Sequence, residues 1–140
     1  MCLRRGFFVF ILLISVQSIF AQQQADGPYI NSQIEKGAPY TLALLVHTGL
    51  QPNKDSAAAW HMLHLQNMFQ LHLDKKISVF GPVTGENADS LAGMIVFNSS
   101  DEALINKWMS KDPYLVNKVM TLKYYKWFSI PGQQLATNPK

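Results

Sequence analysis

The sequence predicts an α+β fold in which four β-strands and two α-helices follow one another in the order β-α-β-β-α-β. Two observations predict this order: two segments whose apolar residues recur with close to helical periodicity, and four short segments rich in β-forming residues. This order is that of the ferredoxin-like arrangement, an antiparallel sheet with two helices on one face. We expect strands at residues 40–46, 77–80, 91–97 and within 119–130, and helices at residues 55–75 and 99–109.

Both predicted helices have recognisable ends. Asp55 or Ser56 can cap the first helix, because their side-chain oxygens accept hydrogen bonds from backbone N–H groups of the first turn. In the second helix, Ser99 and Glu102 have the spacing of a capping box, and the helix is expected to end before Asp112. These signals separate each helix from the strand that precedes it.

The last predicted strand carries large aromatic residues on both of its faces. Tyr124 and Phe128 alternate with Tyr125 and Trp127. Since the helices cover only one face of the sheet, the other would expose a large apolar patch. We therefore expect a homodimer that forms through the sheet faces.

The N-terminus has the features of a secretory signal peptide over residues 1–21. Arg4 and Arg5 are followed by an apolar run at residues 6–16 and by Ala21, a small residue suited to cleavage. The run is shorter than the roughly 20 residues that span a membrane. We expect a secreted or periplasmic protein without a membrane anchor after cleavage. The alternative is an uncleaved N-terminal anchor.

The mature chain is expected to be one domain at residues 40–130. Residues 22–39 are polar and predict a tether with little regular structure, and residues 131–140 predict a flexible tail. The mature chain, residues 22–140, has 10 lysines and 9 acidic residues and a net charge of +1, so no nucleic-acid partner is expected. Cys2, the single cysteine, is removed with the signal peptide, so the mature chain has no disulfide.

His64 and Asp112 are the candidate catalytic pair. His64 lies on the first predicted helix, and Asp112 follows the second. A carboxylate that binds one imidazole nitrogen fixes the tautomer of the ring and raises its basicity. Two helices on one sheet face lie side by side, so the end of one can approach the other. The alternative is that Asp112, which precedes Pro113, only accepts backbone hydrogen bonds in a turn.

His61, Gly81, Pro82 and Tyr114 are candidate ligand-binding residues. His61 lies one helical turn before His64, and Gly81-Pro82 provides a tightly turned backbone for the rim of a pocket. The alternatives are a histidine on the polar face of the helix and a simple loop between two strands. His-x-x-His alone is weak evidence for a metal, so no metal site is expected. The sequence contains no nucleotide fingerprint, and no cofactor is expected.

Residues 40–130 resemble the YCII-related domain family. The resemblance rests on short motifs in a fixed order along this segment: a first strand, the helix with His64, Gly81-Pro82 about seventeen residues later, Gly93 in the next strand, the residues from Ser99 to Ala103 that open the second helix, Asp112-Pro113-Tyr114, and a final strand. Each motif is short and common, whereas their order and spacing together are fairly specific.

The resemblance implies a ferredoxin-like fold that dimerises through its sheets into a dimeric α+β barrel. It also implies an active site built around a histidine and an aspartate, which here are His64 and Asp112. Family members often carry an arginine three residues before the histidine, where this sequence has His61. The family's clamp for a carboxylate or phenolate is therefore not implied for this chain.

The sequence predicts two classes of function for the exported protein. In the first, His64 and Asp112 form an acid–base pocket for a small aromatic or enolisable molecule, with chemistry of the lyase or isomerase type. The alternative is a non-catalytic module that binds a small ligand in the periplasm. A third reading is a metal site formed by His61 and His64. Whether the chain is an enzyme stays open at this stage.

Overall fold

The computed structural model describes residues 25–85, 90–133 and 135. The predicted signal peptide and most of the predicted tail lie outside these residues. The elements in chain order are α1 (Gly27–Ile34), β1 (Ala38–His47), α2 (Lys54–Leu73), β2 (Ile77–Pro82), β3 (Leu91–Phe97), α3 (Glu102–Met109), α4 (Pro113–Val116) and β4 (Met120–Ser129). In this described part of the chain, no helix is both long and apolar enough to cross a lipid bilayer.

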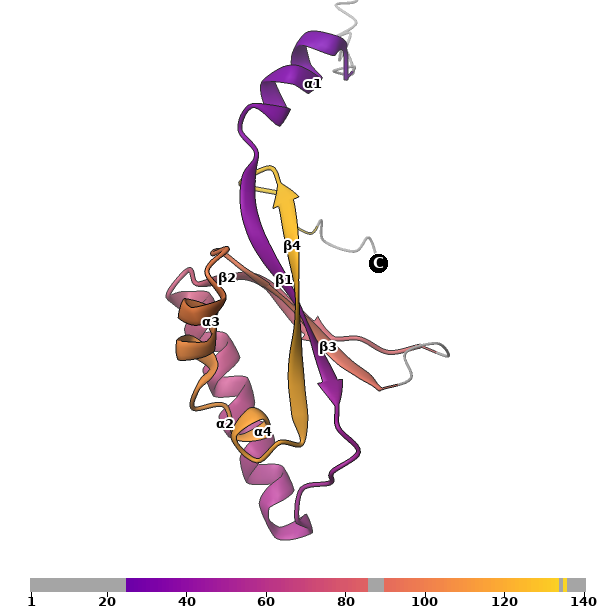
Figure 1. Cartoon of the computed structure of the whole chain (residues 1–140), viewed down its shortest axis with the longest axis vertical. Coiled ribbons are helices and arrows are strands. Elements are labelled where there is room, and N and C mark those ends of the chain that lie inside the picture. The colour runs from indigo at the N-terminus through magenta and orange to yellow at the C-terminus, as the bar shows by residue number, and fades with distance from the viewer. Residues whose placement is uncertain (1–24, 86–89, 134, 136–140) are drawn as a thin grey trace, which may run out of the picture.

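The four strands form one antiparallel sheet in the order β2-β3-β1-β4. Strand β1 lies inside the sheet, where Ala43 is paired with Ile95 of β3 and with Tyr124 of β4. Helices α2, α3 and α4 all lie on one side of the sheet (Figure 1). This strand order and the one-sided helix layer confirm the predicted ferredoxin-like α+β fold.

The hydrophobic core lies between the helices and the sheet. Alternate strand residues point toward the helices, and Ala43 of β1 and Phe97 of β3 are fully buried. They belong to one cluster with Met68 of α2 and Ile105 of α3. Phe97 also stacks on Trp108, with 6.3 Å between the ring centroids. Burial of these apolar side chains holds α2 and α3 on the sheet.

Helix α3 begins differently from the prediction. Its N-cap is Asp101, whose Oδ1 accepts hydrogen bonds from the backbone N–H groups of Ala103 and Leu104. Ser99 instead accepts a hydrogen bond from the N–H of Asp101, so the predicted capping box of Ser99 and Glu102 is wrong. Asp101 has the extended backbone that an N-cap requires, and its carboxylate is as good a cap as a serine hydroxyl.

A short helix, α4, follows Asp112 and was not predicted. Asp112 is its N-cap and Pro113 lies in its first turn. Proline lacks a backbone N–H, but an N–H in the first turn has no acceptor within the helix, so none is needed there. Pro113 therefore starts a helix as well as following the end of α3. Four residues are too few to produce a helical pattern in the sequence.

Gly81 and Pro82 belong to strand β2. The alternative interpretation of the sequence, in which they form a loop between two strands, is wrong. Strand β2 continues two residues beyond the predicted end, and Gly81 pairs with Met94 and Pro82 with Gly93. A proline is tolerated here because β2 is an edge strand, where one side of the backbone needs no partner. The Gly81-Pro82 backbone is thus fixed by the sheet.

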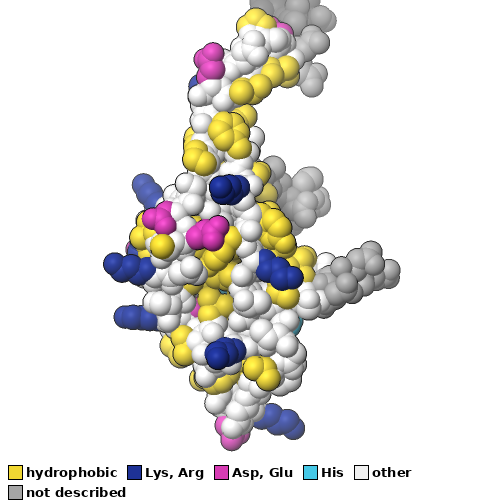
Figure 2. Space-filling model, in the orientation of Figure 1, with side chains coloured by type: hydrophobic (Ala, Val, Ile, Leu, Met, Phe, Trp, Pro, Cys, Tyr) yellow, Lys and Arg dark blue, Asp and Glu magenta, His cyan; other side chains and the backbone are white. Residues whose placement is uncertain are grey.

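Helix α1 occupies part of the segment that was predicted to have little regular structure. Asp26 caps it through a 2.9 Å hydrogen bond from the N–H of Tyr29, and Pro28 lies in its first turn. No residue of α1 is buried, and hydrophobic side chains are visible on this end of the molecule (Figure 2). The polar composition of this segment did not predict a helix, because the helix is stabilised by its N-cap and its first-turn proline and not by a buried apolar face.

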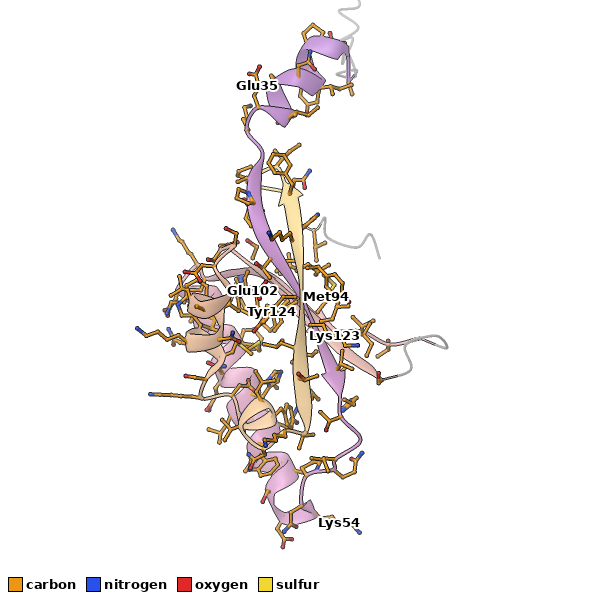
Figure 3. The ribbon with its side chains drawn as sticks, viewed as in Figure 1. Glu35, Lys54, Met94, Glu102, Lys123 and Tyr124 are labelled. Atoms are coloured by element: carbon orange, nitrogen blue, oxygen red, sulfur yellow. The ribbon has the colours of Figure 1, made fainter. Side chains whose placement is uncertain are left out.

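The sheet face that points away from the helices is largely apolar. The register places Leu44 of β1 beside Met94 of β3 and Lys123 of β4. Figure 3 shows Met94 and Lys123 on this side of the sheet and Tyr124 on the helix side. Trp127 lies on the same side of the sheet as Lys123 and is 42% exposed. We call the side that carries Leu44, Met94 and Trp127 the open face.

Gly93 marks a close approach between strands β3 and β2. A Cβ atom on Gly93 would lie 2.9 Å from the carbonyl oxygen of Gly81, a backbone atom that cannot rotate away. We expect Gly93→Ala to lower the free energy of unfolding by about 1–3 kcal/mol, measured by urea denaturation. Gly81→Ala is the control, because a Cβ there meets no heavy atom within 4 Å. Equal losses in the two variants would contradict the steric explanation.

Candidate functional site

A pocket of about 340 Å³ lies between α2 and the helix side of the sheet. This volume suits a small molecule. Helices α2 and α4 and all four strands contribute to its lining. Five of the six residues predicted from the sequence line it: His61, His64, Gly81, Pro82 and Tyr114. The sixth, Asp112, is bonded to His64.

His64 and Asp112 form a direct hydrogen bond. The distance between His64 Nδ1 and an Asp112 carboxylate oxygen, Oδ2, is 2.7 Å. The Asp112 side chain has no exposed area, whereas that of His64 is 12% exposed. A carboxylate oxygen only accepts hydrogen bonds, so Nδ1 of His64 carries the proton and Nε2 is left for a ligand. His64 can therefore reach the pocket while Asp112 is shielded from it.

Two further donors hold the Asp112 carboxylate in place. Its Oδ1 accepts a hydrogen bond from the backbone N–H of Tyr114 at 3.1 Å, which is the capping bond of α4. Its Oδ2 also accepts one from the side-chain amide of Asn67 at 3.3 Å. Asp112 thus fills both roles that the sequence left open, the turn residue and the partner of His64. A buried carboxylate with three donors has a fixed orientation.

Tyr114 and His61 form a second pair at the same pocket. The distance between the Tyr114 hydroxyl and His61 Nδ1 is 3.2 Å. The Tyr114 ring also lies against His64, with 5.0 Å between the ring centroids. Burial raises the pKa of the Tyr114 phenol, and the negative charge of Asp112 raises it further. The phenol therefore stays protonated at neutral pH and can donate a hydrogen bond.

The remainder of the pocket wall is apolar. Leu45, Met68 and Phe80 are among the side chains that form it, and Gly81 and Pro82 contribute the edge of the sheet. Among the described lining residues there is no lysine, arginine, aspartate or glutamate. This wall suits a ligand with an apolar body and few polar atoms.

His61 and His64, the two histidines of the metal site considered from the sequence, both have hydrogen-bond partners in the structure. Nδ1 of His61 and Nδ1 of His64 are already bonded to Tyr114 and Asp112. No group of three or more His, Cys, Asp or Glu side chains converges among the residues that the structure describes. The third histidine of α2, His72, instead contacts the backbone carbonyl of Ile77 at 3.3 Å.

Asn67 is a site residue that the sequence reasoning missed. It lies three residues after His64 on α2, so the two side chains emerge one turn apart and reach the same carboxylate oxygen. The i, i+3 spacing from His64 is the feature of the sequence that points to Asn67 as a second partner of the Asp112 carboxylate. An asparagine on a helix is otherwise too ordinary to single out.

A larger depression, of about 760 Å³, lies at the other end of α2. His72, Lys75 and Phe80 are among its lining residues, together with Gln133 and Leu135 near the C-terminus. It contains no carboxylate–histidine pair among the described side chains that line it. The smaller pocket is therefore the candidate site.

Similarity to known proteins is found only by comparison of structures, not of sequences. No profile of a known protein family matches it, and no curated protein matches it in sequence. Among solved structures it is similar to the 5-chloro-2-hydroxyhydroquinone dehydrochlorinase TftG from Burkholderia phenoliruptrix AC1100, in complex with 2,5-dihydroxybenzoquinone. The two share 16% identity with a TM-score of 0.46, over 63% of this chain and 92% of that chain. Membership of the YCII-related family stays a prediction.

Proposed function

We propose that the pocket binds a small, largely apolar molecule and that His64, oriented by Asp112, moves a proton on it. The reaction class is that of a lyase or an isomerase. The observation that carries this proposal is the 2.7 Å hydrogen bond between partly exposed His64 and fully buried Asp112. Helical histidines are common, but one that is held at a pocket wall by a buried carboxylate has the arrangement of a general base.

In the proposed mechanism, Nε2 of His64 accepts a proton from the bound molecule. The resulting imidazolium is stabilised by the Asp112 carboxylate at Nδ1. The same Nε2–H then returns the proton to another atom of an isomerising substrate, or helps a leaving group to depart in a lyase reaction. Asn67 and the Tyr114 N–H keep the carboxylate in position throughout.

The lining of the pocket supports an aromatic or enolisable ligand without a carboxylate. Apolar side chains such as Leu45 and Met68 favour a flat or cyclic hydrocarbon body. No cationic side chain is found among its described lining residues to pair with a carboxylate. A carbonyl or hydroxyl group would be the polar atom that meets His64 and Tyr114.

Exchange of carbon-bound protons tests this proposal without a known substrate. We expect the protein to accelerate the exchange of the protons next to the carbonyl of cyclohexanone or acetophenone in deuterated water, followed by proton NMR. His64→Gln should lower the protein-dependent rate by about 100-fold or more. His72→Gln is the matched control on α2, because His72 contacts Ile77 rather than this pocket. Equal rates in His64→Gln and the wild type would contradict the proposed role of His64.

Binding without catalysis is the second candidate function. The absence of a cation among the described lining residues favours it, because no strong electrophilic group assists a reaction there. Saturable binding of acetophenone by calorimetry, with no acceleration of exchange by the wild-type protein, would establish this alternative. Measured exchange that depends on His64 would exclude it.

The proposed setting is outside the cytoplasm, and the proposed assembly is a homodimer. The basic and apolar residues of the segment 1–21 support export with cleavage after Ala21. N-terminal sequencing of the exported protein should then begin at Gln22; an intact Met1 would contradict cleavage. The apolar open face supports a dimer of the α+β barrel type.

A further inference from the structure

Tyr114 and His61 lie beside the proposed base and are hydrogen-bonded to each other at 3.2 Å. We infer that Tyr114 is the general acid of the site and that His61 returns its proton from solvent. This inference rests on the proposed function of His64. It assigns catalytic work to two residues that were expected only to contact the ligand.

The arrangement of Tyr114 links it to each of the other site residues. Its backbone N–H donates to Oδ1 of Asp112, and its ring lies 5.0 Å from that of His64 between centroids. Its hydroxyl reaches His61 on α2. A proton acceptor and a proton donor are therefore held side by side at one pocket by α2 and α4.

The proposed reaction needs a hydrogen-bond donor for the carbonyl oxygen in addition to the base. Removal of a proton next to a carbonyl places negative charge on the carbonyl oxygen, and this charge must be stabilised. Among the described lining residues there is no lysine or arginine to do so. Among the described side chains that line the pocket, the Tyr114 hydroxyl and His61 are the hydrogen-bond donors besides His64.

Each proton that moves during enolisation has a donor and an acceptor at the site. Nε2 of His64 takes the proton from carbon, and the electron pair of that C–H bond forms a C=C bond. The π pair of the carbonyl moves to its oxygen, which takes the hydroxyl proton of Tyr114 and becomes an enol. The Tyr114 phenolate takes the Nδ1 proton of His61, and His61 gains a proton at Nε2 from water. The return to the ketone reverses these transfers: the enol oxygen gives its proton to Tyr114, Tyr114 gives its own to Nδ1 of His61, and His61 loses its Nε2 proton to water. His64, whose Nε2 proton has exchanged with solvent, then delivers a solvent proton to carbon, so every group is restored and no other reactant is consumed.

Burial decreases along this route from the pocket to solvent. Asp112 is fully buried, Tyr114 and His64 are partly buried, and His61 is exposed. His61 can therefore exchange protons with water while its other nitrogen contacts the phenol. Burial and the charge of Asp112 raise the pKa of Tyr114, so its hydroxyl is protonated before each turnover.

A structural role is the competing explanation for the Tyr114–His61 hydrogen bond. It joins α4 to α2, and its loss could simply loosen the two helices. Such a role predicts lower stability but no dependence on the buffer. A proton relay predicts that a small external base or acid can replace His61.

The test is the exchange of the carbonyl-adjacent protons of cyclohexanone in deuterated buffer. We expect Tyr114→Phe to lower the protein-dependent rate by about 100-fold, since this is the size of a general-acid contribution. His61→Ala should also lower the rate, and added imidazole buffer should restore it by at least about tenfold. Imidazole should not restore Tyr114→Phe, because the acid itself is missing. His72→Gln should match the wild type at every imidazole concentration.

The outcomes separate this inference from the proposed function. If exchange requires His64 but is unchanged in Tyr114→Phe, the acid is not Tyr114 and only the inference fails. If His61→Ala is slow and imidazole has no effect, the relay is overturned. If the wild-type protein does not accelerate exchange at all, the proposed catalysis fails and the inference falls with it.

Discussion

Replacement of Asp112 by alanine is expected to lower the free energy of unfolding by about 3–5 kcal/mol, because it removes one partner of a buried pair. The variant leaves three donors without an acceptor: Nδ1–H of His64, the amide of Asn67 and the N–H of Tyr114. Each buried donor that loses its partner costs about 1–3 kcal/mol. Helix α4 also loses its cap. Urea denaturation followed by tryptophan fluorescence measures the loss.

Asp101→Ala provides the matched control for this prediction. Asp101 caps α3 through the same kind of bond, but it is exposed and has no histidine partner. Its replacement should cost only about 1 kcal/mol, the usual value of an N-cap. Asp112→Asn keeps the shape of the side chain, but one acceptor oxygen becomes a donor. Its loss of unfolding free energy should fall between those of Asp112→Ala and Asp101→Ala. A loss for Asp112→Ala no larger than that for Asp101→Ala would contradict the proposed importance of the buried network.

The order of the elements was predictable because it depends on local signals. The strand at Leu91–Phe97 was predicted with its exact bounds, and the other strands were found within a few residues. Helix α2 was expected at residues 55–75 and spans Lys54–Leu73, but its N-cap is Asn53, so the predicted cap at Asp55 or Ser56 is wrong. Periodicity and β-forming composition act over a few residues, so the sequence contains them directly.

The features that were missed depend on contacts across the chain or on very short segments. Gly81 and Pro82 look like a turn locally, but pairing with β3 keeps them in the sheet. Helix α4 consists of one turn, and α1 contains no buried residue, so neither has an apolar pattern. Tertiary pairing and individual caps decided the conformation in these cases.

The candidate site could be predicted only in part for the same reason. The local sequence around Asp112 predicted a turn, which is one of its two observed roles. Its bond to His64 joins residues 48 positions apart and depends on how α4 lies against α2. The family resemblance named this pair, whereas Asn67 and the His61–Tyr114 bond required the three-dimensional arrangement.

A charge at the centre of the open face is expected to convert the proposed homodimer into monomers. Leu44 pairs with Met94 and Lys123 on the two neighbouring strands, so Leu44→Lys places an unpaired charge next to another lysine. In a monomer this lysine stays in water, and the fold should be retained. In the dimer it would be buried against the second sheet, at a cost of about 3 kcal/mol, which corresponds to a dissociation constant about 100-fold higher.

Sedimentation equilibrium of the wild type, Leu44→Lys and Val116→Lys would measure this effect. Val116 is a suitable control because its side chain is 60% exposed on α4, on the helix side of the sheet. The wild type and Val116→Lys should be dimers at a concentration where Leu44→Lys is a monomer with an unchanged circular dichroism spectrum. A monomeric wild type would contradict the dimer, and a Leu44→Lys variant that still dimerises would place the interface elsewhere. Since the pocket lies on the helix side, ligand binding should survive in the Leu44→Lys monomer.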